Sequence, residues 1–217
     1  VFHNLVLVDE INRAPPKVQS ALLEAMAEAQ VTSGNETHQL PDPFLVVATQ
    51  NPIEHDGTFP LPEAQLDRFL MHVVLHLPDA VTERQILDLV ETEGQSPITK
   101  PVRLHLDDIR AAKRAAMAVH LSSPLRDYIV RLVTATRQPP FADDIDHAVS
   151  PRGSLALAAA SKARAYLIGR DHALPEDVQA VAADALSHRL VMTWRAVSEG
   201  RTARDLIADV INTVEPL

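Results

Sequence analysis

Two adjacent carboxylates directly follow a short apolar run near the beginning of the chain. Residues 5–8 read Leu-Val-Leu-Val, and Asp9 and Glu10 come next. Such a run predicts a strand buried on both faces, as in a parallel sheet. Ligands of open α/β sheets bind just beyond the carboxyl ends of the strands. Two carboxylates there can divide the work of phosphoryl transfer, one holding Mg²⁺ and the other orienting a water. The structural alternative is a buried strand that ends in acidic loop residues.

A helix, a hairpin and a second strand follow in an order typical of an α/β unit. Two prolines and apolar residues at helical spacing predict a helix over 15–29, and Gly34-Asn35 predicts the turn of a hairpin over 30–40. A second buried strand is expected over 44–49, and Asn51 follows it. If the two strands are neighbours, this amide can touch the same ligand. The alternative is an Asn that caps or turns the chain before a proline.

The remaining elements place the boundary between two domains at Pro78. A Pro-rich loop over 53–62, a short helix over 63–69 and a third strand over 70–77 complete an α/β domain of residues 1–78. Residues 79–217 are predicted to be almost wholly helical. Their expected helices lie at 82–92, 107–120, 123–137, 151–168, 175–189 and 202–213, with a short extended segment at 102–104.

Composition limits the classes of function. The 217 residues carry a formal net charge of −9, which disfavours general electrostatic binding of nucleic acid. Without Cys the chain has no disulfide, no thiolate metal site and no Cys nucleophile, which agrees with a cytoplasmic protein. No apolar stretch is long enough to predict a membrane span. His72 and His76 have strand spacing, but packing explains them better than a metal site.

Four segments resemble motifs of the AAA+ ATPases, specifically the MoxR family. They are residues 5–16 (LVLVDEINRAPP), 48–52 (ATQNP), 61–69 (LPEAQLDRF) and 150–152 (SPR). Their order and separation extend the resemblance over most of the chain. It implies an α/β fold: a partial AAA+ P-loop NTPase core, with a parallel sheet and helices, followed by an α-helical lid domain.

The resemblance also implies roles for individual residues. Asp9 matches the Walker B carboxylate that holds Mg²⁺ through water, and Glu10 the residue that polarises the attacking water. Asn51 matches sensor 1, which contacts the γ-phosphate or that water. Arg68 matches the arginine finger that acts on the ATP of a neighbouring subunit, and Arg152 matches sensor 2 of the lid. Each arginine alone has a surface interpretation, as a residue favoured at a helix end or in a first turn.

The chain departs from the family in two places. An ATPase of this kind needs a Gly-x-x-x-x-Gly-Lys-Ser/Thr loop to cradle phosphates, and none of the six glycines here precedes a Lys. We therefore expect this chain to be the C-terminal part of a longer protein and to bind ATP poorly by itself. Family members commonly have Ala after the sensor 2 Arg, whereas Gly153 stands here.

The resemblance implies a function for the intact protein. It would bind ATP and Mg²⁺ and hydrolyse ATP between subunits of a homo-oligomeric ring, expected to be hexameric, as a chaperone-like remodelling ATPase. Family members often work with von Willebrand factor A domain proteins. The alternative is a non-hydrolysing interaction module that has lost nucleotide binding. A nucleic-acid motor of a related AAA+ branch is disfavoured by the acidic charge.

Overall fold

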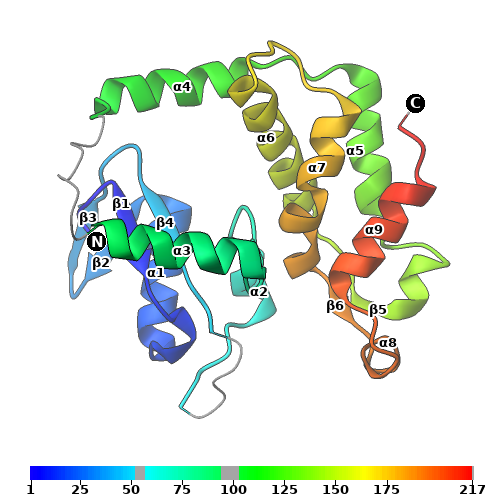
Figure 1. Ribbon diagram of the computed structural model, residues 1–217, viewed down its shortest axis with the longest axis horizontal. Helices are drawn as coiled ribbons and strands as arrows, with labels where there is room; N and C mark the ends of the chain where they lie inside the picture. The colour runs from blue at the N-terminus through cyan, green and yellow to red at the C-terminus, as the bar shows by residue number, and fades with distance from the viewer. Residues whose placement is uncertain (52–56, 94–102, 217) are drawn as a thin grey trace.

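The computed structural model describes residues 1–51, 57–93 and 103–216. Figure 1 shows an N-terminal part built on a small sheet, beside a C-terminal bundle of helices. The elements of the N-terminal part are β1 (Leu5–Val8), a 3-10 turn (Ile11–Arg13), α1 (Pro16–Glu28), β2 (Gln30–Ser33), β3 (Glu36–Gln39), β4 (Leu45–Ala48) and α2 (Glu63–Leu66). Two longer helices follow, α3 (Ala80–Glu93) and α4 (Leu106–Ala118).

β1 and β4 are parallel neighbours, so their carboxyl ends meet at one edge. Their register pairs Leu5 with Leu45 and Val8 with Ala48. β2 and β3 form a separate antiparallel hairpin, which confirms the turn predicted at Gly34-Asn35. The sheet packs on a small core of Ile11, Leu22 and Leu61.

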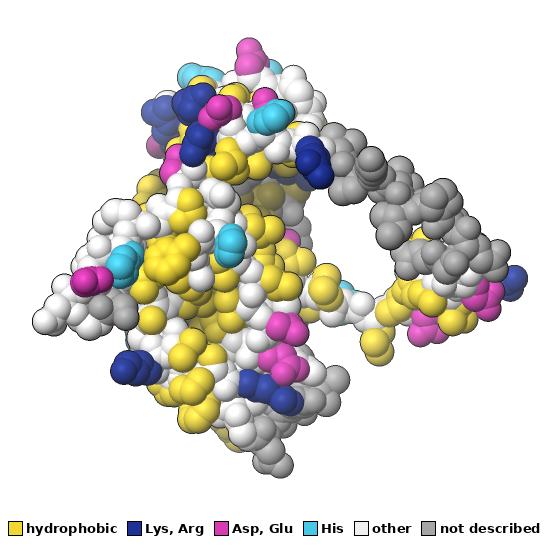
Figure 2. Space-filling model, turned by 90° about the vertical axis from the view of Figure 1, so that its left-hand side faces the viewer, with side chains coloured by type: hydrophobic (Ala, Val, Ile, Leu, Met, Phe, Trp, Pro, Cys, Tyr) yellow, Lys and Arg dark blue, Asp and Glu magenta, His cyan; other side chains and the backbone are white. Residues whose placement is uncertain are grey.

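One face of the β1–β4 pair is exposed, so the prediction of burial on both faces is wrong for this chain. The exposed fractions are 62% for Leu5, 66% for Leu7, 58% for Leu45 and 44% for Val47. These residues share a face by register, while Val8 and Ala48 on the opposite face contact the small core. Figure 2 views the molecule from the left-hand side of Figure 1, where β1–β3 lie, and shows many apolar side chains at the surface. The run is fully apolar, but the described residues cover only one of its faces.

The third strand predicted over 70–77 is not formed. Among the described residues this sheet contains only β1 and β4, and the segment pairs with neither of them. Its backbone turns to the helical bundle instead: the His72 N–H donates to the Asp184 carbonyl at 2.8 Å. A strand needs a neighbour to accept its hydrogen bonds, and an apolar pattern alone does not supply one.

The C-terminal helical bundle agrees closely with the helices predicted for the second half of the expected lid domain, 79–217. Its elements are α5 (Ser123–Ala135), a 3-10 turn (Phe141–Asp144), β5 (Ile145–His147), α6 (Pro151–Leu167), α7 (Pro175–Leu186), a second 3-10 turn (Ser187–Arg189), β6 (Val191–Met192), α8 (Trp194–Ser198) and α9 (Ala203–Thr213). The β5–β6 pair and α8 were not predicted, because runs of two to five residues carry no readable period.

Local signals explain where the helices of the lid begin. The Ser122 and Ser150 hydroxyls accept N–H groups of the first turns of α5 and α6, and a proline opens α6. Thr202 and Asp205 form a reciprocal capping box at α9. The core between these helices includes the fully buried side chains of Tyr128, Leu132, Leu157, Leu186, Leu206 and Ile207.

Two predicted segments lie partly outside the described residues: positions 53–56 of the Pro-rich loop and position 102 of the short extended segment. Among the helices that the structure describes, none is both long and apolar enough to cross a bilayer.

Candidate functional site

Asp9 and Glu10 lie at the carboxyl end of β1, where Thr49 at the end of β4 holds both of them. The Thr49 hydroxyl donates to Asp9 Oδ1 at 2.5 Å and accepts the Glu10 N–H at 2.9 Å. The Thr49 N–H donates to the Val8 carbonyl at 2.9 Å, so the ladder of the sheet continues up to the carboxylates. Asn51 lies two residues after Thr49 on the same chain segment. The edge predicted from sequence is therefore formed, with Thr49 as an added member.

Glu10 has a left-handed backbone, with φ 49° and ψ 55°. This conformation is uncommon for a residue other than Gly and stores backbone strain of order 1 kcal/mol, which tends to occur at functional sites. The Glu10 carboxylate also pairs with Arg13, with 3.0 Å between Oε2 and Nε. The chain therefore leaves the strand direction at Glu10 and enters the 3-10 turn Ile11–Arg13.

The turn after Glu10 is held by hydrogen bonds from the buried side-chain amide of Gln19. Gln19 of α1 is 2% exposed, and its Nε2 donates to the carbonyls of Ile11 and Phe59 at 3.2 and 3.0 Å. The Phe59 N–H in turn donates to the Asn12 carbonyl at 2.6 Å. These hydrogen bonds join the turn after Glu10 to the loop that leads to α2. The backbone that follows the two carboxylates is therefore held by both α1 and this loop.

The donor set at this edge fits Mg²⁺ bound together with a nucleotide. Carboxylate and hydroxyl oxygens are the ligands that Mg²⁺ takes, usually one or two of them with waters and phosphate oxygens completing the shell. Asp9 supplies such an oxygen, and the Thr49 hydroxyl orients it. Within the described ranges no group of three or more His, Cys, Asp or Glu side chains could hold a metal by itself, so phosphate and water would have to complete the shell.

Arg68 and Arg152 come together elsewhere, in a surface cavity of about 420 Å³. It lies between the end of α1, the turn after α2 and the first turns of α6. Arg68 is exposed, and its side chain makes no hydrogen bond or ion pair with any residue that the structure describes. Arg152 is also exposed and contacts Asp67, with 3.5 Å between Nη1 and Oδ2. Both arginines are therefore available to an anion that enters this cavity.

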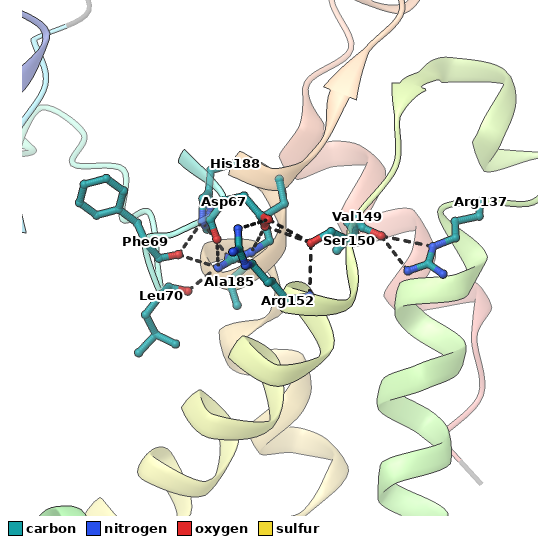
Figure 3. A network of polar contacts seen from close by, with 10 residues as sticks. Asp67, Phe69, Leu70, Arg137, Val149, Ser150, Arg152, Ala185 and His188 are labelled. Atoms are coloured by element: carbon teal, nitrogen blue, oxygen red, sulfur yellow. Dashed lines mark hydrogen bonds and ion pairs between the residues drawn. The ribbon is translucent and has the colours of Figure 1, made fainter. Parts of the chain in front are cut away.

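The wall of the cavity contains a polar network that joins the turn after α2 to the lid (Figure 3). Arg189 is its centre: the side chain is 3% exposed and its Nε donates to Asp67 Oδ1 at 3.0 Å. The Ser150 hydroxyl, which caps α6, donates to the same carboxylate, at 3.1 Å from Oδ2. Asp67 thus receives bonds from two elements of the lid.

His188 lies against this network and is neutral near pH 7. Burial, with the positive charge of Arg189 as a second cause, lowers the pKa of His188 from 6.5 to about 4. Its Nε2 lies 3.1 Å from the Phe69 carbonyl and 2.8 Å from Arg189 Nη1. A protonated ring would add a second positive charge beside a buried guanidinium. Burial also lowers the pKa of Arg189, although Asp67 opposes this shift.

The carboxylate group and the arginine group lie at opposite ends of α1. Glu10 precedes the helix, which starts at Pro16, whereas Met26 near its end lines the cavity of the arginines. Ten residues of α-helix span about 15 Å at 1.5 Å per residue. The predicted carboxylates and the predicted arginines therefore lie in two separate groups, at opposite ends of α1.

Sequence reasoning missed Thr49, Gln19, Asp67 and Arg189. Thr49 could have been found, because a polar residue ending the neighbouring parallel strand must face the end of β1. Arg189 also had a signal: it continues the buried stripe of Val178, Ala182 and Ala185 along α7 at helical spacing. Gln19 bonds to the carbonyls of Ile11 and Phe59, and Asp67 bonds to Arg189. These partners are eight or more positions away in the sequence, so no local pattern shows them.

Comparison with known proteins shows which family this fold and sequence belong to. Residues 1–71 match the model of the ATPase family associated with various cellular activities (AAA), and residues 141–210 match the AAA lid domain. The uncharacterized protein YeaC of Bacillus subtilis is 42% identical over 99% of this chain, and Chaperone MoxR1 of Mycobacterium tuberculosis is 43% identical over 99%. The chain spans 66% and 58% of the lengths of these two relatives.

A solved structure shows the same fold. The crystal structure of a candidate ATPase from Cytophaga hutchinsonii superposes with a TM-score of 0.91 and 40% identity, covering 99% of this chain and 67% of that one. Sequence identity, the two family matches and the shared fold lead to one conclusion: the chain belongs to the MoxR family of AAA+ ATPases.

Proposed function

We propose that the intact protein binds and hydrolyses ATP at the interfaces between subunits of a ring, as a chaperone-like remodelling ATPase. The observation that carries the proposal is the division of the site into two halves. Asp9 and Glu10 lie at one end of α1, and the exposed Arg68 lies at the other with Arg152. Two such halves can meet only when the carboxylates of one subunit face the arginines of the next.

In this proposal each residue has a separate task. Glu10, held at its backbone by Thr49, polarises the water that attacks the γ-phosphate, and Asn51 orients that water or the phosphate. Asp9 would hold Mg²⁺ through water; the ion, when bound, neutralises charge on the β- and γ-phosphates. Arg68 of the neighbouring subunit stabilises the charge that develops on the transferred phosphoryl group.

Arg152 acts with Arg68 rather than with Asp9 of its own chain. It lines the same cavity as Arg68, and its weak 3.5 Å contact with Asp67 leaves the exposed guanidinium able to turn toward a phosphate. A pair of arginines from one subunit then contacts the nucleotide held by the next. This proposal makes the position of the lid part of the catalytic geometry.

We also propose a division near residue 78 into the ATPase core and the helical lid, with cytoplasmic action and a von Willebrand factor A domain partner. The two separate family matches, at residues 1–71 and 141–210, support the division. Binding of such a partner to the intact protein can be measured by titration calorimetry with and without ATP.

The test is a mixing experiment with the intact protein and Mg-ATP. Arg68→Ala subunits and Glu10→Gln subunits should each release phosphate very slowly alone. Mixed together, they should regain activity, because some interfaces combine an intact Glu10 with an intact Arg68. If no ratio restores phosphate release although both variants assemble with wild type, the interfacial mechanism is wrong. If the unaltered protein also releases no phosphate, a non-hydrolysing interaction module is the better description.

A further inference from the structure

We propose that Arg189 and Asp67 are positioning residues for the two arginines of the interface: Arg189 fixes the backbone on both sides of Arg68, and Asp67 ties it to the start of α6, which carries Arg152. The inference rests on the proposed function of Arg68 as an interfacial arginine. It assigns a role to a buried ion pair far from the carboxylates of the same chain.

The guanidinium of Arg189 binds three backbone carbonyls of the turn that contains Arg68, one before that residue and two after it. Nη2 donates to the carbonyls of Asp67 and Phe69 at 3.1 and 2.6 Å, and Nη1 donates to the Leu70 carbonyl at 3.3 Å. Nη1 also donates to the Ala185 carbonyl within the lid. The carbonyls before and after Arg68 are therefore bound by one side chain whose planar fork has a fixed geometry.

The backbone around Arg68 and the side chain of Arg68 differ in how they are held. The backbone on either side of Arg68 is tied down, yet its own exposed side chain is bound to none of the described residues. A structural arginine would use its donors within its own chain. The donors of the Arg68 guanidinium can instead bind an acceptor on another molecule, while hydrogen bonds from Arg189 hold the backbone around Arg68. Such preorganisation lowers the entropy cost of reaching a reactive geometry.

Asp67 connects the turn of Arg68 to the first turn of α6, which contains Arg152. Its Oδ1 accepts from Arg189 Nε, and both of its oxygens accept from the Ser150 hydroxyl, at 3.3 and 3.1 Å. That hydroxyl also accepts the Arg152 N–H at 3.2 Å, and Arg152 Nη1 lies 3.5 Å from Asp67 Oδ2 (Figure 3). The turn of Arg68 and the first turn of α6 are thus bound to the same carboxylate and move together. A shift of the lid would displace both arginines at once.

The pair has a matched control at the other end of α7. Arg170 makes a forked contact with buried Asp177, at 2.7 Å from each oxygen, near the first turn of that helix. Arg189 lies just beyond the last turn. Both pairs bind a carboxylate to a lid arginine, but only Arg189 also holds the turn of Arg68. Replacing either Arg by Lys keeps the charge and loses the fork.

The experiment measures phosphate release from Mg-ATP by mixed subunits of the intact protein. Arg189→Lys alone should lower kcat roughly 100-fold, the scale of a misplaced catalytic group, with little change in the KM for ATP. Mixed with Glu10→Gln, Arg189→Lys should regain activity, because its own Glu10 is intact. Mixed with Arg68→Ala, it should not, because neither subunit then presents an ordered arginine. Arg170→Lys should keep wild-type kcat despite a similar loss of thermal stability.

Three other outcomes of the phosphate-release measurements would contradict the inference. Wild-type kcat in Arg189→Lys, restored activity with Arg68→Ala, or failure to recover with Glu10→Gln would each assign the pair a purely structural role. If Arg189→Lys does not fold, Asp67→Asn, which keeps one acceptor for Arg189 Nε, is tested by the same mixtures with the same expected outcomes. The mixture of Arg68→Ala and Glu10→Gln separates the two proposals: if it fails, the interfacial mechanism itself is wrong.

Discussion

The Thr49 hydroxyl donates to Asp9 Oδ1 across the ends of two parallel strands, with 2.5 Å between the oxygens. The same oxygen accepts the N–H of Glu10, whose backbone is left-handed. One small side chain therefore orients a carboxylate that would hold Mg²⁺ and a backbone that would present the catalytic base. The hydroxyl has a single proton, which it donates to Asp9, so it cannot donate to another partner without releasing that carboxylate.

Thr49→Val should slow ATP hydrolysis by the intact protein about 10- to 100-fold, the usual effect of removing a group that orients a metal-binding carboxylate. Valine keeps the shape of Thr but can neither donate to Asp9 nor accept from Glu10. Thr49→Ser, which keeps the hydroxyl, should retain most of the activity. Steady-state phosphate release against Mg²⁺ concentration is the measurement. Thr134→Val on α5, where the hydroxyl bonds only to its own helix, is the control. Equal activity of Thr49→Val and wild type would contradict this role.

The stability of the lid should fall as the pH is lowered from 6.5 toward 4. His188 has a pKa of about 4 in the folded chain against an ordinary value of 6.5. Between these values the unfolded chain binds the proton and the folded chain does not, so acid favours unfolding. The loss should total about 1 to 2 kcal/mol after allowance for the part of the ring that water reaches. Below about pH 4 this contribution levels off, because both states are then protonated.

Thermal melting between pH 7 and pH 4 measures this effect. His188→Gln should show a shallower dependence on pH in this window, whereas His172→Gln, at a half-exposed ring, should follow wild type. An unchanged slope in His188→Gln would show that other groups cause the acid sensitivity.

Asp177→Asn should destabilise the lid by about 3 kcal/mol, the usual result of breaking a buried ion pair. The Asp177 side chain is 1% exposed, and it accepts from both arms of Arg170 and from the Leu174 N–H at 2.9 Å. Burial by itself would raise the pKa of Asp177, but these hydrogen bonds outweigh it and hold the pKa below its ordinary value. Denaturant unfolding followed by circular dichroism tests the prediction. A loss below about 1 kcal/mol would mean that the pair is weaker than its geometry indicates.

Gly153→Ala should destabilise the chain by about 1 kcal/mol, although alanine is the better helix former. A Cβ at this position would lie 2.2 Å from Val149 Cγ1 and 3.2 Å from Leu186 Cδ2, both in buried side chains. The strain of overpacking, about 1 to 3 kcal/mol, exceeds the gain of 0.5 to 1 kcal/mol from replacing Gly in a helix. The melting temperature should fall by about 2 to 4 °C. Ser154→Ala, at the next position of α6, should not lower it, and a higher melting temperature for Gly153→Ala would contradict the packing argument.

The sequence determined the longer helices that the structure describes and, within two residues, where they begin; the short α8 was not predicted. Apolar spacing and the caps at Ser150 and Thr202 act within a few residues, so they can be read locally, and the predicted helices agree with the structure at nearly every position. The apolar run before Asp9 predicted a strand with its carboxylates at the sheet edge, and the structure has both. The family motifs added the roles of the single residues, which remain proposals.

Tertiary structure decided what those elements contact. The extended segment after Leu70 bonds to α7 instead of a strand, and one face of β1 lies uncovered, because hydrogen-bond partners and burial come from neighbours that a local pattern does not specify. Only the tertiary structure shows that Arg189 contacts Asp67, more than a hundred residues away in the sequence, and that Arg68 and Arg152 line the same cavity. Buried polar groups must find partners somewhere in the fold, and only the packed chain shows which ones they find.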